Sequence, residues 1–287
     1  MIYLSEFTLP SLGRREGFIN GQRRTCYSTY YPFDLFPARE VPPFTFEPVT
    51  ILCGGNGCGK STVLNLIAEK LGMAHGTAYN RSAFFGDYLA LCECETRGEP
   101  DAIRNGRFIA SDDVFDYLLN VRTLNDGIDR KREELFDEYT SAKHAQYRFR
   151  GLQDYEELKR FVDSHRRTQS HYVNDRLMQN VRERSNGESA LGFFVESIGE
   201  NALYLLDEPE NSLSAEKQLE LARHLSDSAR FFGCQFVIAT HSPFLLSMKG
   251  AKLYNMDAQP PAPDRWTNLP NVRATFDFFM EHQNEFQ

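Results

Sequence analysis

The chain has 287 residues, which is enough for two domains or for one elaborated domain. Hydrophobic residues make up 41% and charged residues 25%, a composition that excludes disorder over most of the length. The formal net charge of −8 argues against a uniformly basic coat for nucleic acid, although a local basic patch is compatible with it.

The start of the chain and its hydropathy predict a cytoplasmic protein without a membrane span. Residues Met1–Glu6 lack the basic and apolar regions of a secretory signal, and no run approaches the roughly 18 apolar residues of a membrane helix. The six cysteines form no pair of Cys-x-x-Cys knuckles, so we expect reduced thiols. Cys92 and Cys94 are a weak candidate for metal ligation.

The first third of the chain alternates β-rich runs with turn residues. Residues 1–53 are predicted to form short strands and turns, with proline punctuating the runs. The apolar spacing predicts a helix over Ser61–Leu71. Strands are predicted over Tyr88–Glu95 and Arg107–Ala110.

The rest of the chain changes in character twice. Residues 111–184 lack proline and show helical apolar spacing, which predicts an inserted helical subdomain. Ala202–Leu206 and Gln235–Ala239 are short apolar runs of the kind that form central parallel strands. Residues 258–270 are predicted to form a surface loop before a short helix. The pattern predicts an α/β fold with a mixed or parallel sheet core flanked by helices, with one lobe made of residues 1–110 and 185–287.

A phosphate-binding loop is predicted between an expected strand and an expected helix. The segment from Gly54 to Ser61 reads GGNGCGKS and matches G-x-x-x-x-G-K-[ST] without a mismatch. Glycines let successive backbone N–H groups surround phosphate oxygens at a helix N-terminus. Lys60 is expected to contact the β and γ phosphates and Ser61 to bind Mg²⁺; the competing interpretation is an ordinary glycine-rich turn. The residues expected to bind nucleotide here are Gly54, Asn56, Gly57, Cys58, Gly59, Lys60, Ser61 and Thr62.

Two carboxylates follow the apolar run that ends at Leu206. A buried parallel strand delivers such residues to the sheet edge where open α/β folds bind ligands. There Asp207 is expected to hold Mg²⁺, and Glu208 to orient or deprotonate an attacking water. The competing interpretation is a strand that simply ends in a solvated turn.

Three further segments lie in the order found in one superfamily. Residues 185–188 read SNGE, residues 209–214 read PENSLS, and residues 239–243 read ATHSP. With the two preceding motifs, they resemble the signature, D-loop and switch histidine of ATP-binding-cassette (ABC) ATPases. The segments NGCGKS and THSPFLL are most similar to the soluble branch, which includes chromosome-maintenance, recombination-repair and overcoming-lysogenization-defect ATPases.

Some positions depart from the transporter pattern. No glutamine stands in residues 109–113, where transporters have a Q-loop glutamine, so Ser111 or Asp112 is a candidate replacement. Ser214 stands where transporter D-loops often have aspartate. The interval 111–184 is too short for the long coiled coil of a chromosome clamp.

The resemblance implies a phosphate-loop NTPase of the ABC type with ATP and Mg²⁺ as cofactors. It implies a head-to-tail dimer in which Ser185, Gly187 and Glu188 form the signature that meets the ATP on the other subunit. It also implies that His241 acts with Glu208 in hydrolysis. An ATP-driven switch would then control an effector protein, for which a nuclease is one candidate, or nucleic acid, in repair or phage defence.

Other functions stay open on sequence grounds. A transporter ATPase subunit is disfavoured by the missing Q-loop glutamine, and a small-molecule or nucleotide kinase by the signature and His241. A non-hydrolysing structural head is disfavoured by Glu208. Activity that depends cooperatively on protein concentration would distinguish the switch from the kinase and from a lone structural domain.

Residues 143–184 form a candidate docking surface for nucleic acid or an acidic partner. They contain ten Lys and Arg against six Asp and Glu, with Tyr147, Phe149, Tyr155 and Tyr172 interleaved. The alternative is a solvated helical face whose charges pair with one another.

Overall fold

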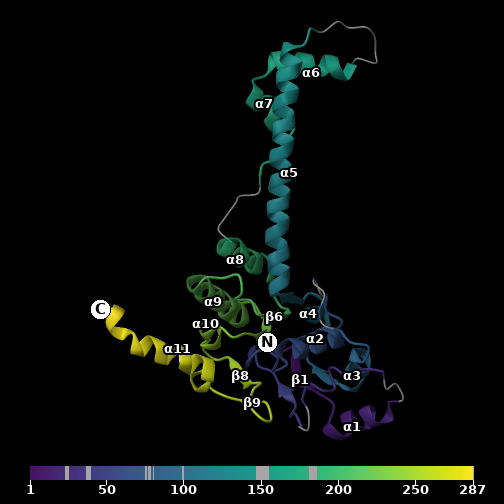
Figure 1. Cartoon of the computed structure of the whole chain (residues 1–287), viewed down its shortest axis with the longest axis vertical. Coiled ribbons are helices and arrows are strands. Elements are labelled where there is room, and N and C mark those ends of the chain that lie inside the picture. Colours follow the sequence, from purple (N-terminus) through teal and green to yellow (C-terminus); the bar gives the residue numbers. More distant parts are fainter. Residues whose placement is uncertain are drawn as a thin grey trace. The chain divides into compact units, whose positions relative to one another are not determined.

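The computed structural model describes the chain in two compact units (Figure 1). Unit 1 comprises Met1–Phe115 and Asn186–Gln287, and unit 2 comprises Asp116–Ser185. The described residues are 1–22, 26–36, 40–74, 76, 79, 81–98, 100–146, 155–180 and 186–286.

A six-stranded sheet forms the centre of unit 1. Its strand order is β5-β6-β7-β3-β8-β9, parallel except for the last pair. The strands are β3 (Val49–Cys53), β5 (Arg107–Ala110), β6 (Leu203–Asp207), β7 (Gln235–Ala239), β8 (Lys252–Asn255) and β9 (Ala262–Pro263). All residues of β3 and β7 are buried, as expected for parallel strands covered on both faces.

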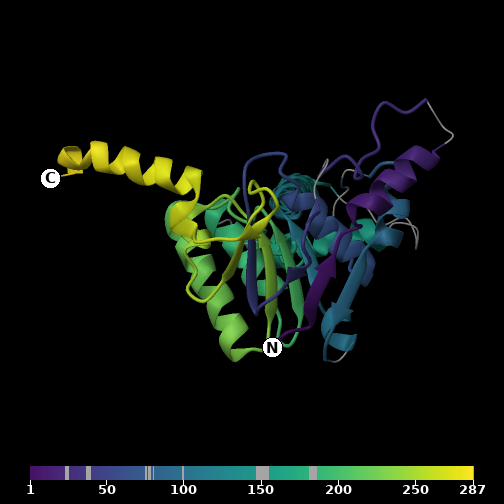
Figure 2. The same cartoon turned by 90° about the horizontal axis from the view of Figure 1, so that it is seen from below.

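A smaller antiparallel sheet packs beside the first. Its order is β2-β1-β4, formed by Phe44–Thr45, Leu4–Thr8 and Glu93–Thr96. The fully buried Gln235 joins the two sheets, because its Oε1 accepts from the Tyr3 and Leu4 N–H groups at 2.7 and 2.8 Å. Its Nε2 donates to the Leu4 carbonyl at 2.8 Å. Figure 2 shows β1 (purple) on one side of the larger sheet and α9 (light green) on the other.

Helices pack on the larger sheet. α2 packs on β6 and β7, and α9 packs on β7. The unit 1 helices are α1 (Leu12–Gly21), α2 (Lys60–Leu71), α3 (Phe85–Leu91), α4 (Pro100–Arg104), α8 (Asn186–Ser197), α9 (Ala215–Phe231), α10 (Pro243–Leu246) and α11 (Pro270–Glu281). Two 3₁₀ turns lie at Trp266–Asn268 and Gln283–Phe286.

Unit 2 is helical over its described residues. It contains most of α5 (Ser111–His144), a single helix of 34 residues, together with α6 (Tyr155–Arg166) and α7 (Gln169–Asn174). A small core of Leu135, Tyr139, Tyr172 and Val173 joins α5 to α7. The Tyr172 hydroxyl donates to Glu138 at 2.8 Å.

The predicted fold class is confirmed, but two local predictions were wrong. Residues Leu12–Gly21 form helix α1, because Ser11 caps it and Arg15 is buried; three glycines had weakened the helical signal. The strand predicted over Tyr88–Glu95 begins only at Glu93. Its first half belongs to α3, where Phe85 and Tyr88 are fully buried three residues apart, a helical spacing.

Candidate functional site

The phosphate loop connects β3 to α2. Gly57 and Gly59 have φ values of 80° and 100°, in the left-handed region that favours glycine. A Cβ on Gly59 would lie 3.1 Å from the Leu35 side chain, so glycine also permits this close approach. All eight residues predicted to bind nucleotide lie in this loop or in the first turn of α2.

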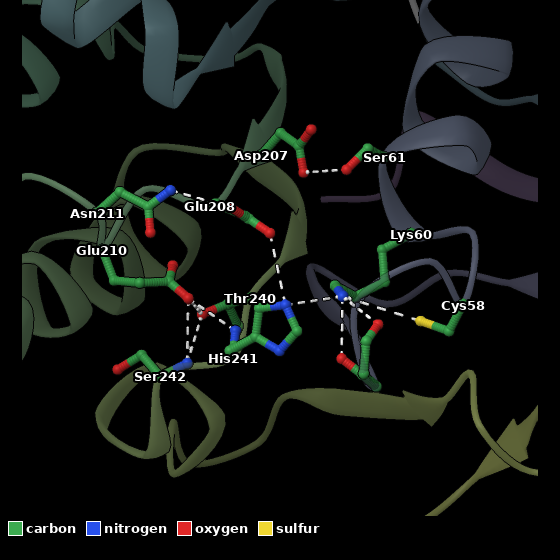
Figure 3. Close-up of polar contacts among 12 residues, drawn as sticks. Cys58, Lys60, Ser61, Asp207, Glu208, Glu210, Asn211, Thr240, His241 and Ser242 are labelled. Carbon is green, nitrogen blue, oxygen red and sulfur yellow. Dashed lines mark hydrogen bonds and ion pairs between the residues drawn. The ribbon is translucent and has the colours of Figure 1, made fainter. Parts of the chain in front are cut away.

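The Lys60 side chain folds back over the loop. Its Nζ donates to the carbonyl oxygens of Gly54 and Gly55 at 2.9 and 3.1 Å, and lies 2.9 Å from Nε2 of His241 (Figure 3). Lys60 is buried. The loop therefore holds a buried ammonium whose hydrogen-bond partners among the described residues are carbonyl, thiol and imidazole groups and include no carboxylate, an arrangement suited to receive an anion.

Ser61 and Asp207 face each other at the end of β6. The Ser61 hydroxyl donates to Asp207 Oδ1 at 3.0 Å. Burial raises the pKa of Asp207 to about 6; the neighbouring Glu208 adds to this, while the Ser61 hydrogen bond opposes it. A half-buried carboxylate beside a hydroxyl is a pair of hard oxygen donors that fits a magnesium ion.

Glu208 has a left-handed backbone, with φ of 49°. Its N–H still pairs with the Ala239 carbonyl at 2.9 Å, so the chain turns away immediately after the sheet. Its Oε2 accepts from Asn211 Nδ2 at 2.9 Å, and its Oε1 lies 3.4 Å from His241 Nε2. The carboxylate is thereby fixed beside the phosphate loop.

His241 lies between Lys60 and Glu208. The same nitrogen, Nε2, faces Lys60 Nζ and Glu208 Oε1. Nε2 accepts from the ammonium when it carries no proton, and donates to the carboxylate when it does. Whether Nε2 carries the hydrogen, which depends on the tautomer, therefore decides which of the two it binds.

Lys60, Asp207 and Glu208 line a cavity of about 730 Å³, whereas His241 is not among its lining residues. The phosphate loop, Asp207 and Glu208 form one part of its wall, and Tyr31, Leu35 and Tyr79 form another. The Tyr31 hydroxyl lies 2.8 Å from that of Thr62. Both candidate replacements for the Q-loop glutamine, Ser111 and Asp112, also line the cavity.

A family model described as "AAA domain, putative AbiEii toxin, Type IV TA system" matches residues 103–247, just over half of the chain. The chain belongs to this AAA family. The matched segment includes the helical insert, Asp207, Glu208 and His241. The AAA domain is an ABC-type ATPase domain, so the resemblance drawn from the sequence is confirmed.

Solved structures of ABC ATPases are also similar to this AAA domain. One is the Smc head domain with an extended coiled coil bound to the C-terminal domain of ScpA, derived from Pyrococcus furiosus. It shares 13% sequence identity with this chain at a TM-score of 0.44, and the match covers 99% of this chain and 100% of that chain. Another is a nucleotide-free ATP-binding cassette from an ABC transporter, with 16% identity, a TM-score of 0.43 and coverage of 95% and 98%. No curated protein matches.

The segment predicted from the sequence to be the signature, residues 185–188, extends into the start of α8. Ser185 lies outside the described residues, whereas Gly187 and Glu188 lie in the first turn. A Cβ on Gly187 would approach Lys217, Ser212 and Ser214 only at ordinary van der Waals distances of 3.8–4.0 Å. Neither Gly187 nor Glu188 lines the cavity that contains Lys60.

Three acidic or amide side chains near the AAA site were not singled out from the sequence. Asn211 binds Glu208, and Glu210 binds the segment around His241. Asp257 accepts from the Gly55 N–H at 2.7 Å. Asn211 and Glu210 immediately follow the motif at Asp207 and Glu208, which was an available signal. Asp257 follows β8, 202 residues from its partner, and no sequence pattern indicated it.

The remaining candidate from the sequence was metal ligation by Cys92 and Cys94; no membrane span was predicted. All six cysteines are free thiols; Cys92 is buried and Cys94 half-buried. Within the described ranges there is no cluster of three or more His, Cys, Asp or Glu side chains placed to hold a metal ion. No described helix of the AAA chain is long and apolar enough to cross a membrane.

The predicted basic surface at 143–184 falls partly outside the described residues, including Tyr147, Arg148, Phe149, Arg150, Arg182 and Arg184. Several of its described cations form ion pairs within unit 2. Arg160 pairs with Glu138, and Arg167 pairs with Asp163 and Asp175. Arg176 pairs with Asp163 and stacks 3.6 Å from the Tyr172 ring centre. In the described part, these charges contribute to the packing of the helices.

Proposed function

We propose that this AAA domain hydrolyses ATP with Mg²⁺ and acts as a switch whose ATP is shared between two copies in a head-to-tail dimer. The observation that carries the proposal is the convergence of Lys60, His241 and Glu208. Nζ and Oε1 lie 2.9 and 3.4 Å from one imidazole nitrogen, beside a cavity lined by the phosphate loop. A cation that can bind phosphate, a carboxylate and an imidazole thus lie close together. This arrangement suits the attack of water on a γ-phosphate.

Ser61 and Asp207 would hold the magnesium ion. Their oxygens are already 3.0 Å apart, and the half-buried Asp207 carboxylate has no cationic hydrogen-bond partner among the described residues. When bound, magnesium supplies positive charge that neutralises phosphate oxygens. Lys60 would exchange its carbonyl contacts for the β and γ phosphates.

Glu208 is our candidate for the group that activates water, and His241 for the group that positions the γ-phosphate and the water. Asn211 holds Oε2 of Glu208, which leaves Oε1 directed at the imidazole. A proton taken from water by this carboxylate would lie within reach of Nε2, because the two atoms are 3.4 Å apart.

The dimer follows from where the signature lies. Gly187 and Glu188 lie at the start of α8 and do not line the cavity of their own chain. In the ABC resemblance the signature contacts ATP on the opposite subunit, so Ser185 and Gly187 would donate hydrogen bonds to a γ-phosphate held by Lys60 of the other copy.

An effector protein would respond to the dimer state. The description of the matching family names a putative toxin of a toxin–antitoxin system, and this agrees with a role in phage defence. A nuclease is one candidate effector. Nucleic acid bound through residues 143–184 is a second candidate partner, carried by the described residues Lys143, Lys159 and Arg166 and by residues outside the described part.

The test measures nucleotide binding and turnover in matched variants. Lys60→Ala should lose tight ATP binding, because it removes the cation of the loop. Glu208→Gln should bind ATP normally, hydrolyse it at least about 100-fold more slowly, and sediment as a dimer with ATP and Mg²⁺. Lys249→Ala, at an exposed lysine away from the cavity, is the control.

The outcome that contradicts the proposal is wild-type turnover in both Lys60→Ala and Glu208→Gln. Turnover that requires an added phosphate acceptor and does not depend on protein concentration would favour the kinase. Turnover that requires a membrane partner would favour the transporter subunit.

A further inference from the structure

The carboxylate of Glu210 organises the turn that contains His241. Its Oε1 accepts three hydrogen bonds: from the Thr240 hydroxyl at 2.7 Å, from the His241 N–H at 2.7 Å and from the Ser242 N–H at 3.1 Å (Figure 3). Successive N–H groups that converge on one anion form a backbone nest. These groups lie just beyond the end of β7, so Glu210 gives the two N–H groups the acceptor that strand pairing no longer provides.

The environment makes this contact costly to lose. Thr240 is fully buried, so removal of the acceptor leaves its hydroxyl without this buried partner, and the His241 N–H loses its acceptor as well. The Ser242 N–H keeps a second acceptor, the Thr240 hydroxyl oxygen at 3.0 Å. The other oxygen of Glu210, Oε2, is itself buried and has no hydrogen-bond partner within the described ranges. A buried carboxylate oxygen without a hydrogen-bond donor is unfavourable for folding. Packing alone therefore does not explain a glutamate at position 210.

Gln218 of α9 joins the same two segments at another point. Its Oε1 accepts from the Ser242 hydroxyl at 2.6 Å, and its Nε2 donates to the Leu213 carbonyl at 2.8 Å. Residues 209–214 are therefore tied to residues 240–242 by two side chains. Of these two, only Glu210 contacts the His241 backbone.

The segment 209–214 also has an exposed side. Asn211 and Ser214 are exposed, and Asn211 binds Glu208. In the proposed dimer this segment corresponds to the D-loop, so displacement of it by a second copy would move Glu210 and Asn211 together.

We propose that Glu210 is a positioning residue that sets His241 through its backbone N–H and transmits movement of residues 209–214 to the imidazole. The inference rests on the proposed ATPase function. Nε2 of His241 lies 2.9 Å from Lys60 Nζ and 3.4 Å from Glu208 Oε1. A small shift of this turn therefore changes which of these two groups the imidazole contacts.

The test is a double-mutant cycle on turnover and nucleotide affinity. Glu210→Ala should lower kcat by about 100-fold and leave the Kd for ATP unchanged, since the phosphate loop is not altered. In a His241→Ala background, Glu210→Ala should cause no further loss of kcat. Glu210→Gln keeps an acceptor oxygen at this position and should recover most of the turnover.

Gln218→Ala is the matched control. It removes the second connection between the same segments without touching the His241 N–H, so Tm should fall while kcat per folded molecule stays close to that of the wild type. If Glu210→Ala does not fold, the cycle is run with Glu210→Gln, whose smaller loss should likewise vanish in the His241→Ala background.

Additive losses from Glu210 and His241 variants would overturn the inference, because they would show that Glu210 acts independently of the imidazole. An equal fall in kcat for Gln218→Ala and Glu210→Ala would overturn it as well. Absence of turnover in the wild-type chain would instead overturn the proposed ATPase function, so the two failures are distinguishable.

Discussion

Lys60 binds the protein's own carbonyl oxygens, at the place where a phosphate-loop lysine meets phosphates. Its contacts with Gly54, Gly55 and His241 are short and polar, at 2.9–3.1 Å. They keep a buried ammonium hydrogen-bonded without an anion. Nucleotide binding must break these contacts, so part of the attraction between lysine and phosphate offsets their loss.

The carboxylate of Asp207 should make magnesium binding depend on pH. Its folded-state pKa of about 6 lies above the ordinary value of 3.8, so the folded chain holds this proton more tightly than the unfolded chain does. The stabilising contribution of this group is thus complete below about pH 4 and is lost as the pH rises through about 6. Mg²⁺ must displace the same proton, so its affinity should rise over this window and level off above it.

Thermal melts with and without Mg²⁺ and a non-hydrolysable ATP analogue, from about pH 5 to about pH 8, check this expectation. The Mg²⁺-dependent increase in Tm should grow with pH in the wild type. Asp207→Asn is the control, because it cannot titrate and should show little Mg²⁺ effect at any pH. A wild-type increase that is independent of pH contradicts the assignment of Asp207 as a ligand.

At the scale of elements, the contact between β5 and β6 depends on Gly106. A Cβ at this position would lie 2.1 Å from the Leu203 carbonyl oxygen and 3.0 Å from that of Ile103. Both neighbours are backbone atoms, which cannot move aside as a side-chain tip does. The close approach of the chain to β6, which presents Asp207 and Glu208, therefore requires glycine here.

Gly106→Ala should lower the free energy of unfolding by about 1–3 kcal/mol, because the added methyl group forces the strands apart. Denaturant unfolding of the whole chain measures this change. Gly17→Ala is the matched control in the same unit: it lies in α1 with no atom within 4 Å of its Cβ position, so it should be neutral or stabilising. Equal effects of the two substitutions would contradict the steric argument.

Elements with one strong local pattern were predictable from the sequence. β3, β6 and β7 are short, mostly apolar runs, and α2 follows a phosphate-loop motif, so pattern and environment agree. α1 and α3 were missed because their formation depends on what they bury, such as Arg15 and Tyr88, rather than on propensity. Asp257 and Gln235 were missed for a related reason: each acts through hydrogen bonds to residues about 200 positions away in the chain.

At the scale of the whole molecule, the proposed shared site can be tested by mixing subunits. Lys60→Ala chains should not hold ATP, and Gly187→Arg chains should not close over ATP on a second copy. In a mixed dimer one interface carries both lesions and the other carries neither, so activity should partly return. A Cβ at Gly187 would meet only ordinary van der Waals contacts of 3.8–4.0 Å, so the first atom of the new side chain does not clash with its own chain.

Turnover is measured over a range of mixing ratios, with each variant alone as the baseline and with mixed dimers confirmed by sedimentation. A maximum at intermediate ratios supports a signature that acts on the opposite subunit. No recovery at any ratio, with folded mixed dimers present, would place the function of Gly187 within its own chain.

At position 208, selection for stability and selection for turnover would favour different residues. The left-handed backbone at this position, with φ of 49°, costs a glutamate on the order of 1 kcal/mol, whereas glycine or asparagine adopts it more readily. Random variation screened only for heat resistance or yield would therefore enrich Gly or Asn at the position on which we propose hydrolysis depends. Retention of glutamate there would need continuing selection for turnover itself.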